Sequence, residues 1–338
     1  MTNLECHSVR TRALALTGLL ALLALVAAGT AAAAGGGFQP VTPQSPNASR
    51  ITSTYWFVFG FAVAIFLLVE IALVVFIIRY RSRGRGREVE GAQVHGHARL
   101  ELLWTAVPVL ILVAIAVFTF YKLPGIKNVP KASAADPQLE VKVLGRQFYW
   151  EFLYPNGAVA VDTMRAPRGR VVKLDVTSPR FDVIHSWWVP ALGGKIDAIP
   201  GNTNHTWFDA DKAGTFHGRC AEFCGMFHAA MTSQVQALPP AQFDTWVKQR
   251  AANPTGSGLG RETFQGTCGK CHGMQGQGGV GPALTGNPLI TQRGGITRLL
   301  ENGGVTMPPV GRGWPRSQLN ALLTYLSTNI AKTGSGGR

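Results

Sequence analysis

The sequence predicts a multidomain membrane protein with a two-helix transmembrane hairpin, an all-β domain and a small all-α domain. Two apolar runs, 55–78 and 102–121, are each long enough to cross a hydrocarbon core of ~30 Å at about 1.5 Å per residue. Between 139 and 238, short strand-like runs are separated by Pro, Gly, Asp and Asn, which is typical of a β-sandwich or barrel. Beyond 260 the apolar residues recur at helical spacing.

The first segment has the order of a secretory signal peptide. Arg10 and Arg12 precede an apolar run over 13–28, which is followed by small residues up to Gly37. We therefore expect residues 1–34 to be removed on export. Cys6 lies before the apolar run, so we expect it to have no role in the mature protein.

The hairpin, expected over 49–122, sets the topology. Six arginines lie in or beside its connecting loop, namely Arg79, Arg81, Arg83, Arg85, Arg87 and Arg99. A short loop rich in arginine stays in the cytoplasm, so everything after Lys122 should lie on the outer face of the membrane. The net charge of +14 includes these residues, and we do not expect nucleic acid as a partner.

Two acidic residues lie in the predicted spans. Glu70 is inside the first span, where an ionisable group is costly unless it finds a partner or water. We expect it to make a polar contact with another subunit. Glu101 opens the second span, where an acid interacts favourably with the N-terminus of a helix.

The segment His217–Met231, with the sequence HGRCAEFCGMFHAAM, gathers an unusual set of metal ligands. It contains Cys220, Glu222, Cys224, His228 and Met231. Thiolates and a thioether favour cuprous copper, and imidazole accommodates both oxidation states. We interpret the loop as a copper site, with His185 as a second imidazole from another strand. A disulfide and a Cys2His2-type zinc site are the alternatives.

An aromatic stretch, Phe148 to Trp150, lies in one predicted strand. At least two of its three side chains are expected to be in the core. The alternative interpretation is a surface contact for a redox partner.

Residues 241–258 are interpreted as a linker, because a short amphipathic piece over 243–247 is followed by the run NPTGSGLG. The next domain, 259–332, contains the motif Cys-Gly-Lys-Cys-His at 268–272. In an exported chain this motif predicts covalent attachment of c-type haem.

In this interpretation Cys268 and Cys271 bind the haem covalently, and His272 is the proximal iron ligand. Met307 is the expected second axial ligand, because Met274 is too close to the cysteines to reach around the ring. His/Met ligation suits electron transfer. The alternatives are a thioredoxin-like pair and half of a zinc site, but there is no βαβ pattern nearby and no second cysteine pair.

Five motifs resemble subunit II of the haem–copper cytochrome c oxidases, in the bacterial form with a fused C-terminal cytochrome c domain. They are RLELLW at 99–104, GRQFYW at 145–150, DVIHSWWVP at 182–190, KIDAIPG at 195–201 and CAEFCGMFHAAM at 220–231. The resemblance covers 49–238 for the oxidase part and 260–330 for the cytochrome. It implies a cupredoxin-like domain over 123–240 that holds a binuclear copper A centre.

The resemblance also implies roles for single residues. The copper ligands would be the side chains of His185, Cys220, Cys224, His228 and Met231 with the main-chain carbonyl of Glu222, the two cysteines bridging the metals. The Glu222 side chain would face subunit I, where the family places magnesium. Glu101 would lie at the mouth of a proton path, which replaces its interpretation as a helix-terminal acid. Phe148, Tyr149 and Trp150 would form the electron-entry patch.

The function implied is that of the electron-input subunit of an aerobic terminal oxidase, with subunits I and III as partners. A cytochrome or membrane-bound donor would reduce the haem, the copper centre would follow, and subunit I would reduce oxygen with proton pumping. Many family members have Trp at the position of Phe148; a tethered donor at roughly millimolar effective concentration makes docking from solution less important. The alternatives are a copper A subunit of a nitric oxide reductase-type enzyme and a non-enzymatic copper carrier.

Overall fold

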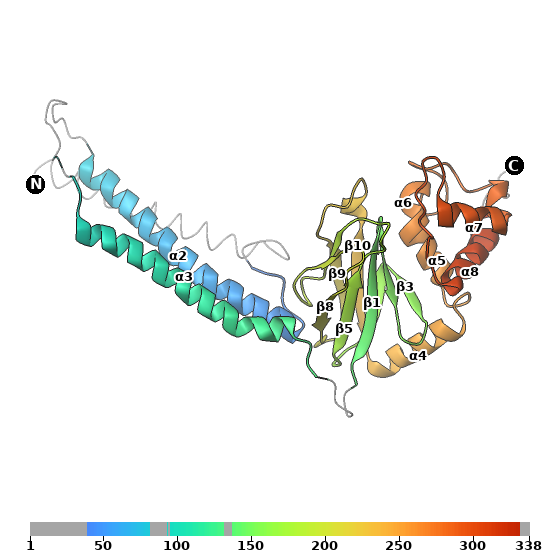
Figure 1. Cartoon of the computed structure of the whole chain (residues 1–338), viewed down its shortest axis with the longest axis horizontal. Helices are drawn as coiled ribbons and strands as arrows, with labels where there is room; N and C mark the ends of the chain where they lie inside the picture. Colours follow the sequence, from blue (N-terminus) through green and yellow to red (C-terminus); the bar gives the residue numbers. More distant parts are fainter. Residues whose placement is uncertain (1–38, 82–92, 94, 132–136, 332–338) are drawn as a thin grey trace, which may run out of the picture. The chain divides into compact units, whose positions relative to one another are not determined.

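The computed structural model describes residues 39–81, 93, 95–131 and 137–331 (Figure 1). The predicted signal peptide, 1–34, lies outside these residues, as do Cys6 and three of the loop arginines, Arg83, Arg85 and Arg87. The predicted fold class is confirmed in the described part of the chain, which contains a helical hairpin, a β-sandwich and a C-terminal helical domain.

The hairpin consists of α2 (Pro46–Tyr80) and α3 (Ala98–Lys127), which extend beyond the predicted spans at both ends. Among the described residues these are the two helices long and apolar enough to cross a membrane, with mean hydropathies of 3.1 and 2.5 in their most apolar windows. The rings of Phe57 and Phe118 stack between them at 4.1 Å. The Arg50 guanidinium of α2 donates to the Gly125 carbonyl of α3 at 2.9 Å. Their apolar surface is exposed, as expected for helices that face lipid.

The β-sandwich has two five-stranded sheets within the described residues, in the orders β3-β2-β1-β5-β8 and β4-β10-β9-β6-β7. The strands are β1 (Leu139–Arg146), β2 (Tyr149–Leu153), β3 (Val159–Val161), β4 (Thr163–Pro167), β5 (Val172–Thr177), β6 (His185–Trp188), β7 (Ile196–Ala198), β8 (Asn204–Phe208), β9 (Gly214–Cys220) and β10 (Thr232–Leu238). Two pairs are parallel, β1 with β5 and β4 with β10. The other pairs are antiparallel.

The strands β2 and β3 are buried on both faces. Successive side chains of a strand point to opposite faces, and here Trp150 and Ala160 belong to the core between the two sheets. Their neighbours Tyr149, Val159 and Val161 belong instead to the core of the C-terminal helical domain. The sequence analysis missed β3, because a strand covered on both faces shows no polar alternation.

The helical domain contains α5 (Leu259–Thr263), a π-helical turn (Phe264–Cys268), α6 (Gly269–His272), a 3-10 turn (Pro288–Thr291), α7 (Arg293–Asn302), α8 (Arg316–Tyr325) and a second π-helical turn (Leu326–Ile330). The sequence predicts apolar residues at helical spacing beyond 260, and at the end of the domain these are Leu322, Leu323, Leu326 and Ile330, which are buried, and Leu319, which is partly buried. These residues therefore form part of the core of the domain.

Most of the range interpreted as a linker is the helix α4 (Pro240–Ala252). Phe243 of this helix is buried in the sandwich core, and Trp246 packs against the same core. The ring of Trp246 lies 5.2 Å from that of Tyr154. The non-helical part of the connection, 253–258, is therefore shorter than the linker expected over 241–258, because one face of the segment finds an apolar partner.

The substitution Phe243→Ala should lower the free energy of unfolding by about 3–5 kcal/mol, because it empties a buried aromatic site. We expect Gln242→Ala, an exposed neighbour on the same helix, to stay within about 0.5 kcal/mol of the parent. Urea unfolding of the detergent-solubilised chain, followed by tryptophan fluorescence, measures both. Equal unfolding curves for the two variants would contradict the packing of α4.

Candidate functional site

Two neighbouring strands and one loop bring the predicted copper ligands together. Cys220 is the last residue of β9, and His185 is the first residue of β6, the strand beside it in the sheet. The loop after β9 carries Cys224 and leads into a 3-10 turn, His228–Ala230, before β10. The Cys220 amide donates to the Met231 carbonyl at 2.9 Å, which closes this loop at its base.

The sulfur and nitrogen atoms of these residues form a continuous cluster. Cys220 Sγ lies 4.0 Å from Cys224 Sγ, 3.9 Å from His185 Nδ1 and 3.2 Å from the carbonyl oxygen of Glu222. Cys224 Sγ lies 3.6 Å from His228 Nδ1 and 3.8 Å from Met231 Sδ. The potential ligand atoms of His185, Cys220 and Cys224 all lie within 4.8 Å of one another, and all three residues are buried.

This cluster fits a metal site better than a disulfide. A disulfide bond is about 2.05 Å long, and the two sulfurs are 4.0 Å apart with both thiols free. Two thiol sulfurs, two imidazole nitrogens, a thioether and a carbonyl are linked by contacts of 3.2–4.0 Å, and soft ligands of this kind suit Cu(I) or zinc. No packing requirement explains that donor set.

A carboxylate supports His185 from behind. Its Nε2 lies 3.3 Å from Asp182 Oδ1, while its Nδ1 faces the thiols. Histidine ligands usually bond such a partner through the nitrogen that does not face the metal, which fixes the ring. The other Asp182 oxygen accepts the Gln147 amide at 3.2 Å. Gly145 leaves room for the imidazole, because a Cβ there would lie 3.0 Å from the ring.

The two thiols have opposite pKa shifts. The hydrogen bond between the two thiols lowers the pKa of Cys220 to about 3, in spite of burial, and the bond to His185 adds to this effect. The pKa of Cys224 is raised because its proton is shared with Cys220 and because it is buried. Burial would lower the pKa of His185, but its bonds to Asp182 and Cys220 raise it overall. The site therefore favours the thiolate form at Cys220, and the thiolate is the form that binds metals.

The haem-attachment motif lies on the turn formed by the first π-helical segment and α6. Cys268 is buried and Cys271 is half-buried. His272 Nδ1 lies 2.7 Å from the Pro282 carbonyl oxygen, so it is the nitrogen that donates and Nε2 is left as the free ligand atom. Gly281 makes this approach possible, because a Cβ there would lie 2.8 Å from the imidazole. The turn fits an axially ligated haem.

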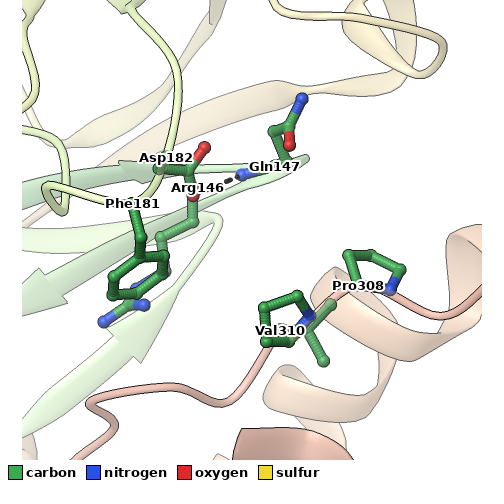
Figure 2. Close-up of a pocket in the computed structure, with 7 residues that line it drawn as sticks. Arg146, Gln147, Phe181, Asp182, Pro308 and Val310 are labelled. Carbon is green, nitrogen blue, oxygen red and sulfur yellow. Dashed lines mark hydrogen bonds between the residues drawn. The ribbon is translucent and has the colours of Figure 1, made fainter. Parts of the chain in front are cut away.

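The loop that carries Met307 faces Asp182, the carboxylate behind His185. Met307 is partly buried against the cytochrome core. Its neighbours Pro308 and Val310 border a cavity of about 40 Å³ whose other wall includes Asp182 (Figure 2). Figure 2 shows Arg146, Gln147 and Phe181 on the same wall as Asp182. The segment with the predicted second haem ligand thus lies close to the residue that orients His185.

The aromatic stretch is mostly core, as expected from the sequence. Tyr149 and Trp150 are fully buried, and Phe148 is half-buried. The Trp150 ring lies 6.0 Å from the His185 ring. The Tyr149 hydroxyl donates to the Val310 carbonyl at 2.9 Å and accepts from Trp314 Nε1 at 2.7 Å. Trp150 therefore contacts the ligand cluster, and Tyr149 contacts the C-terminal helical domain.

The acidic residues singled out from the sequence lie apart from this cluster. Glu101 is in the first turn of α3, where Oε1 accepts the His97 amide at 3.0 Å. Glu70 is half-buried in α2 and makes no hydrogen bond or ion pair to the described part of the chain. The Glu222 side chain is exposed, although its carbonyl points at Cys220.

The sequence analysis missed several residues that hold these sites. Asp182 lies in the same motif as His185, and Gln147 lies in the same motif as Phe148. Their position inside these motifs was the sequence signal that could have found them. Asp162 and Lys270, which form an ion pair at 3.1 Å, are 108 residues apart and gave no signal.

Three family models match the chain in order. The transmembrane domain of cytochrome c oxidase subunit II matches 31–121, and its periplasmic domain matches 158–238. The model for cytochrome c oxidase, cbb3-type, subunit III matches 258–326.

Curated relatives are named cytochrome c oxidase subunit 2. The protein of Alkalihalophilus pseudofirmus is 40% identical over 181 residues, which is 51% of this chain and 52% of the relative. That of Bacillus sp. (strain PS3) is 37% identical over 171 residues, 47% and 48% of the two chains. The chain thus spans about half the length of these relatives.

Among solved structures, the periplasmic domain of cytochrome oxidase subunit II from Bradyrhizobium japonicum is 35% identical, with 37% of this chain and 98% of that chain covered and a TM-score of 0.34. The two domain models of subunit II and the curated relatives indicate the same family, and the third model indicates a cytochrome c domain. Family membership implies copper A, and the cytochrome domain implies haem c. The chain therefore belongs to the cytochrome c oxidase subunit II family and carries a cytochrome c domain after the periplasmic one.

Proposed function

We propose that this chain is the electron-input subunit of a proton-pumping terminal oxidase in a bacterial plasma membrane. The observation that carries the proposal is the chain of donor atoms from His185 through Cys220 and Cys224 to His228, joined by contacts of 3.6–4.0 Å. When bound, haem c and a copper pair supply one-electron exchange, in the order donor, haem, copper pair, subunit I. The chain's residues hold both groups in place.

The copper-binding residues would act chiefly by not moving. His185 and Met231 are fully buried, and the backbone of the loop is bonded to its neighbours on both sides. The Ala221 amide donates to the Ser186 carbonyl at 2.8 Å, and Gln147 Nε2 donates to the Cys224 carbonyl at 2.7 Å. A ligand set held this firmly changes little between oxidation states, which keeps the cost of reorganisation low.

The cytochrome residues would ligate the haem iron through His272 and Met307. The Pro282 carbonyl fixes the orientation of the His272 ring. With histidine and methionine as its ligands, the haem would have a raised reduction potential and would supply electron transfer. This arrangement suits an electron carrier, which agrees with the assignment of oxygen reduction to subunit I.

The surface around the copper loop fits subunit I as the next partner. Phe223 and Met226 of the loop are 78% and 80% exposed, beside the exposed Glu222 carboxylate. Exposed large apolar side chains mark an interaction surface. We assign the Glu222 side chain to a magnesium site at this interface and Glu101 to the entry of a proton path. Subunit III would complete the assembly, and the two spanning helices would anchor it in the lipid bilayer.

The cytochrome domain carries more positive than negative charge. From Leu259 onward it has eight basic and two acidic residues. Arg298 of α7 is exposed, and Arg293 is exposed with one hydrogen bond to Thr324. We therefore assign the electron donor to an acidic or membrane-bound protein.

The copper site is tested by His228→Asn in the assembled oxidase. Copper affinity should fall by more than the roughly 10–100-fold that loss of a supporting residue costs, since a ligand itself is removed. The exposed His217, which lies in the same motif on β9, provides the control His217→Asn with unchanged copper content. Elemental analysis and oxygen uptake are the measurements; equal copper in both variants would refute the assignment.

The haem ligand is tested by Met307→Leu against Met274→Leu. Only the first should lower the reduction potential of the haem, because it replaces the thioether that raises it. Covalent haem should be retained in both, since the cysteines are intact. Redox titration of the purified oxidase measures the potentials, and a shift in Met274→Leu alone would exclude Met307 as the ligand.

The assignment of an acidic electron donor is tested by the salt dependence of haem reduction. The second-order rate of haem reduction should fall as ionic strength rises, because salt screens exposed charges over about 10 Å at 0.1 M. Arg298→Gln should slow the reduction and flatten its salt dependence. Lys212→Gln, an exposed lysine of the copper domain, should change neither. A rate that does not respond to salt would rule out an acidic docking partner.

A further inference from the structure

We propose that Lys270, which lies between the two haem-attachment cysteines, is a positioning residue that locks the attachment turn onto the copper domain. The cytochrome is then a fixed electron donor and not a freely tethered one. This inference rests on the proposed function in one respect, because the step being positioned is electron transfer from haem to copper.

Lys270 reaches out of the cytochrome domain into the copper domain. Its ammonium lies 2.5 Å from the Phe148 carbonyl oxygen and 3.1 Å from Asp162 Oδ2. The lysine side chain is only 10% exposed and the aspartate side chain 22%. A lysine removed from water to this extent needs charged and hydrogen-bonded partners, and here the copper domain supplies all those that the structure gives for its ammonium.

The backbone and the hydrogen bonds of Asp162 hold its carboxylate toward this lysine. It lies between β3 and β4 with a φ of 55°, a left-handed conformation that few residues other than glycine, asparagine and aspartate adopt. Its Oδ1 accepts the Trp150 amide at 2.8 Å, so the carboxylate is bonded on both sides. Burial raises the pKa of Asp162, and Lys270 acts against that rise by favouring the ionised form. The Trp150 ring, in turn, packs beside His185.

A glycine makes the close approach possible. Gly266 lies in the π-helical turn that ends at Cys268, and a Cβ on it would be 2.6 Å from Val161 Cγ1 and 2.9 Å from Asp162 Oδ2. Contacts that short are not tolerated, so any larger residue would push the attachment turn away from β3. The attachment turn is therefore held by the ion pair of Lys270 and by the close packing of Gly266 on β3.

A second group of contacts holds the Met307 loop. The Tyr149 hydroxyl bonds both the Val310 carbonyl and Trp314 Nε1. Arg146, paired with buried Glu151 at 2.7 Å, donates to the Arg312 carbonyl at 2.8 Å. Both segments that carry the predicted haem ligands are thus bonded to the copper domain, one through Lys270 and one through Tyr149 and Arg146.

These contacts correct the expectation of a flexible tether. The two domains share a core to which β2 and β3 contribute, and Glu262 of α5 pairs with both Arg165 of β4 and Arg250 of α4. The effective concentration that a flexible linker gives does not describe electron transfer between two sites that are held by such contacts. The distance from haem to copper is set by the interface.

The test uses the assembled oxidase with both cofactors present. Lys270→Met removes the ammonium, and Asp162→Asn removes the opposite charge while an amide oxygen remains for the Trp150 amide and the left-handed backbone is still favourable. The second variant leaves the attachment motif intact, so it remains informative if Lys270→Met binds haem poorly. The matched controls are Lys248→Met and Asp244→Asn, both at exposed positions of α4.

Two measurements are made on each variant. Hydrogen exchange in the peptides 148–162 and 264–272 reports opening of the contact without any electron transfer. It should accelerate at least about tenfold in both test variants, the effect expected for loss of a charged hydrogen bond. The single-turnover rate from haem to copper should fall in the same two variants, with unchanged haem potential and copper content. The controls should match the unmodified enzyme in both measurements.

Unchanged exchange in Lys270→Met and Asp162→Asn would overturn the lock. Faster exchange with an unchanged transfer rate would overturn the positioning role, because the contact would then be structural only. Absence of haem-to-copper transfer in the unmodified enzyme would instead refute the proposed function, and with it the step that Lys270 positions, whatever the exchange data show.

Discussion

Burial of β2 and β3 on both faces is the constraint on which the arrangement of the two candidate sites depends. One face contributes Trp150 and Ala160 to the sandwich core, and the other contributes Tyr149, Val159 and Val161 to the cytochrome core. The two domains therefore cannot separate without exposing apolar side chains to water, which costs about 25 cal/mol per Å². Association of the domains is in this sense part of folding.

The same strands connect the two metal-binding regions in short steps. Trp150 packs beside His185 on the copper side, while the adjacent residue, Tyr149, bonds the loop that carries Met307. Neighbouring residues of a strand point to opposite faces. The dipeptide Tyr149–Trp150 therefore contacts the helical domain with one side chain and the sandwich core with the other. Phe148 precedes this dipeptide, and its carbonyl accepts the Lys270 ammonium.

Much of the candidate site could be predicted from the sequence, because its chemistry is local. Cys220, Cys224, His228 and Met231 lie within a dozen residues, and Cys268 to His272 form one motif. The partners that orient these ligands could not be predicted. Asp162 and Lys270 meet across 108 residues, and their contact depends on β3, a strand with no alternating pattern. The full length of α4 was not predicted either, because a run of Pro, Gly and polar residues follows it and its packing through Phe243 and Trp246 is tertiary.

The sequence by itself determined the spanning helices, the kinds of metal ligand and the order of the domains, because hydrophobic length, ligand softness and motif spacing are properties of neighbouring residues. Only the tertiary structure decided which strand brings His185 to Cys220, which carboxylate orients it and how the cytochrome is held. These outcomes depend on strand pairing and on a shared core between distant segments. The contact with the cytochrome domain depends on the burial of β2 and β3 on both faces, and the meeting of His185 with Cys220 depends on the pairing of β6 with β9; no local pattern records either.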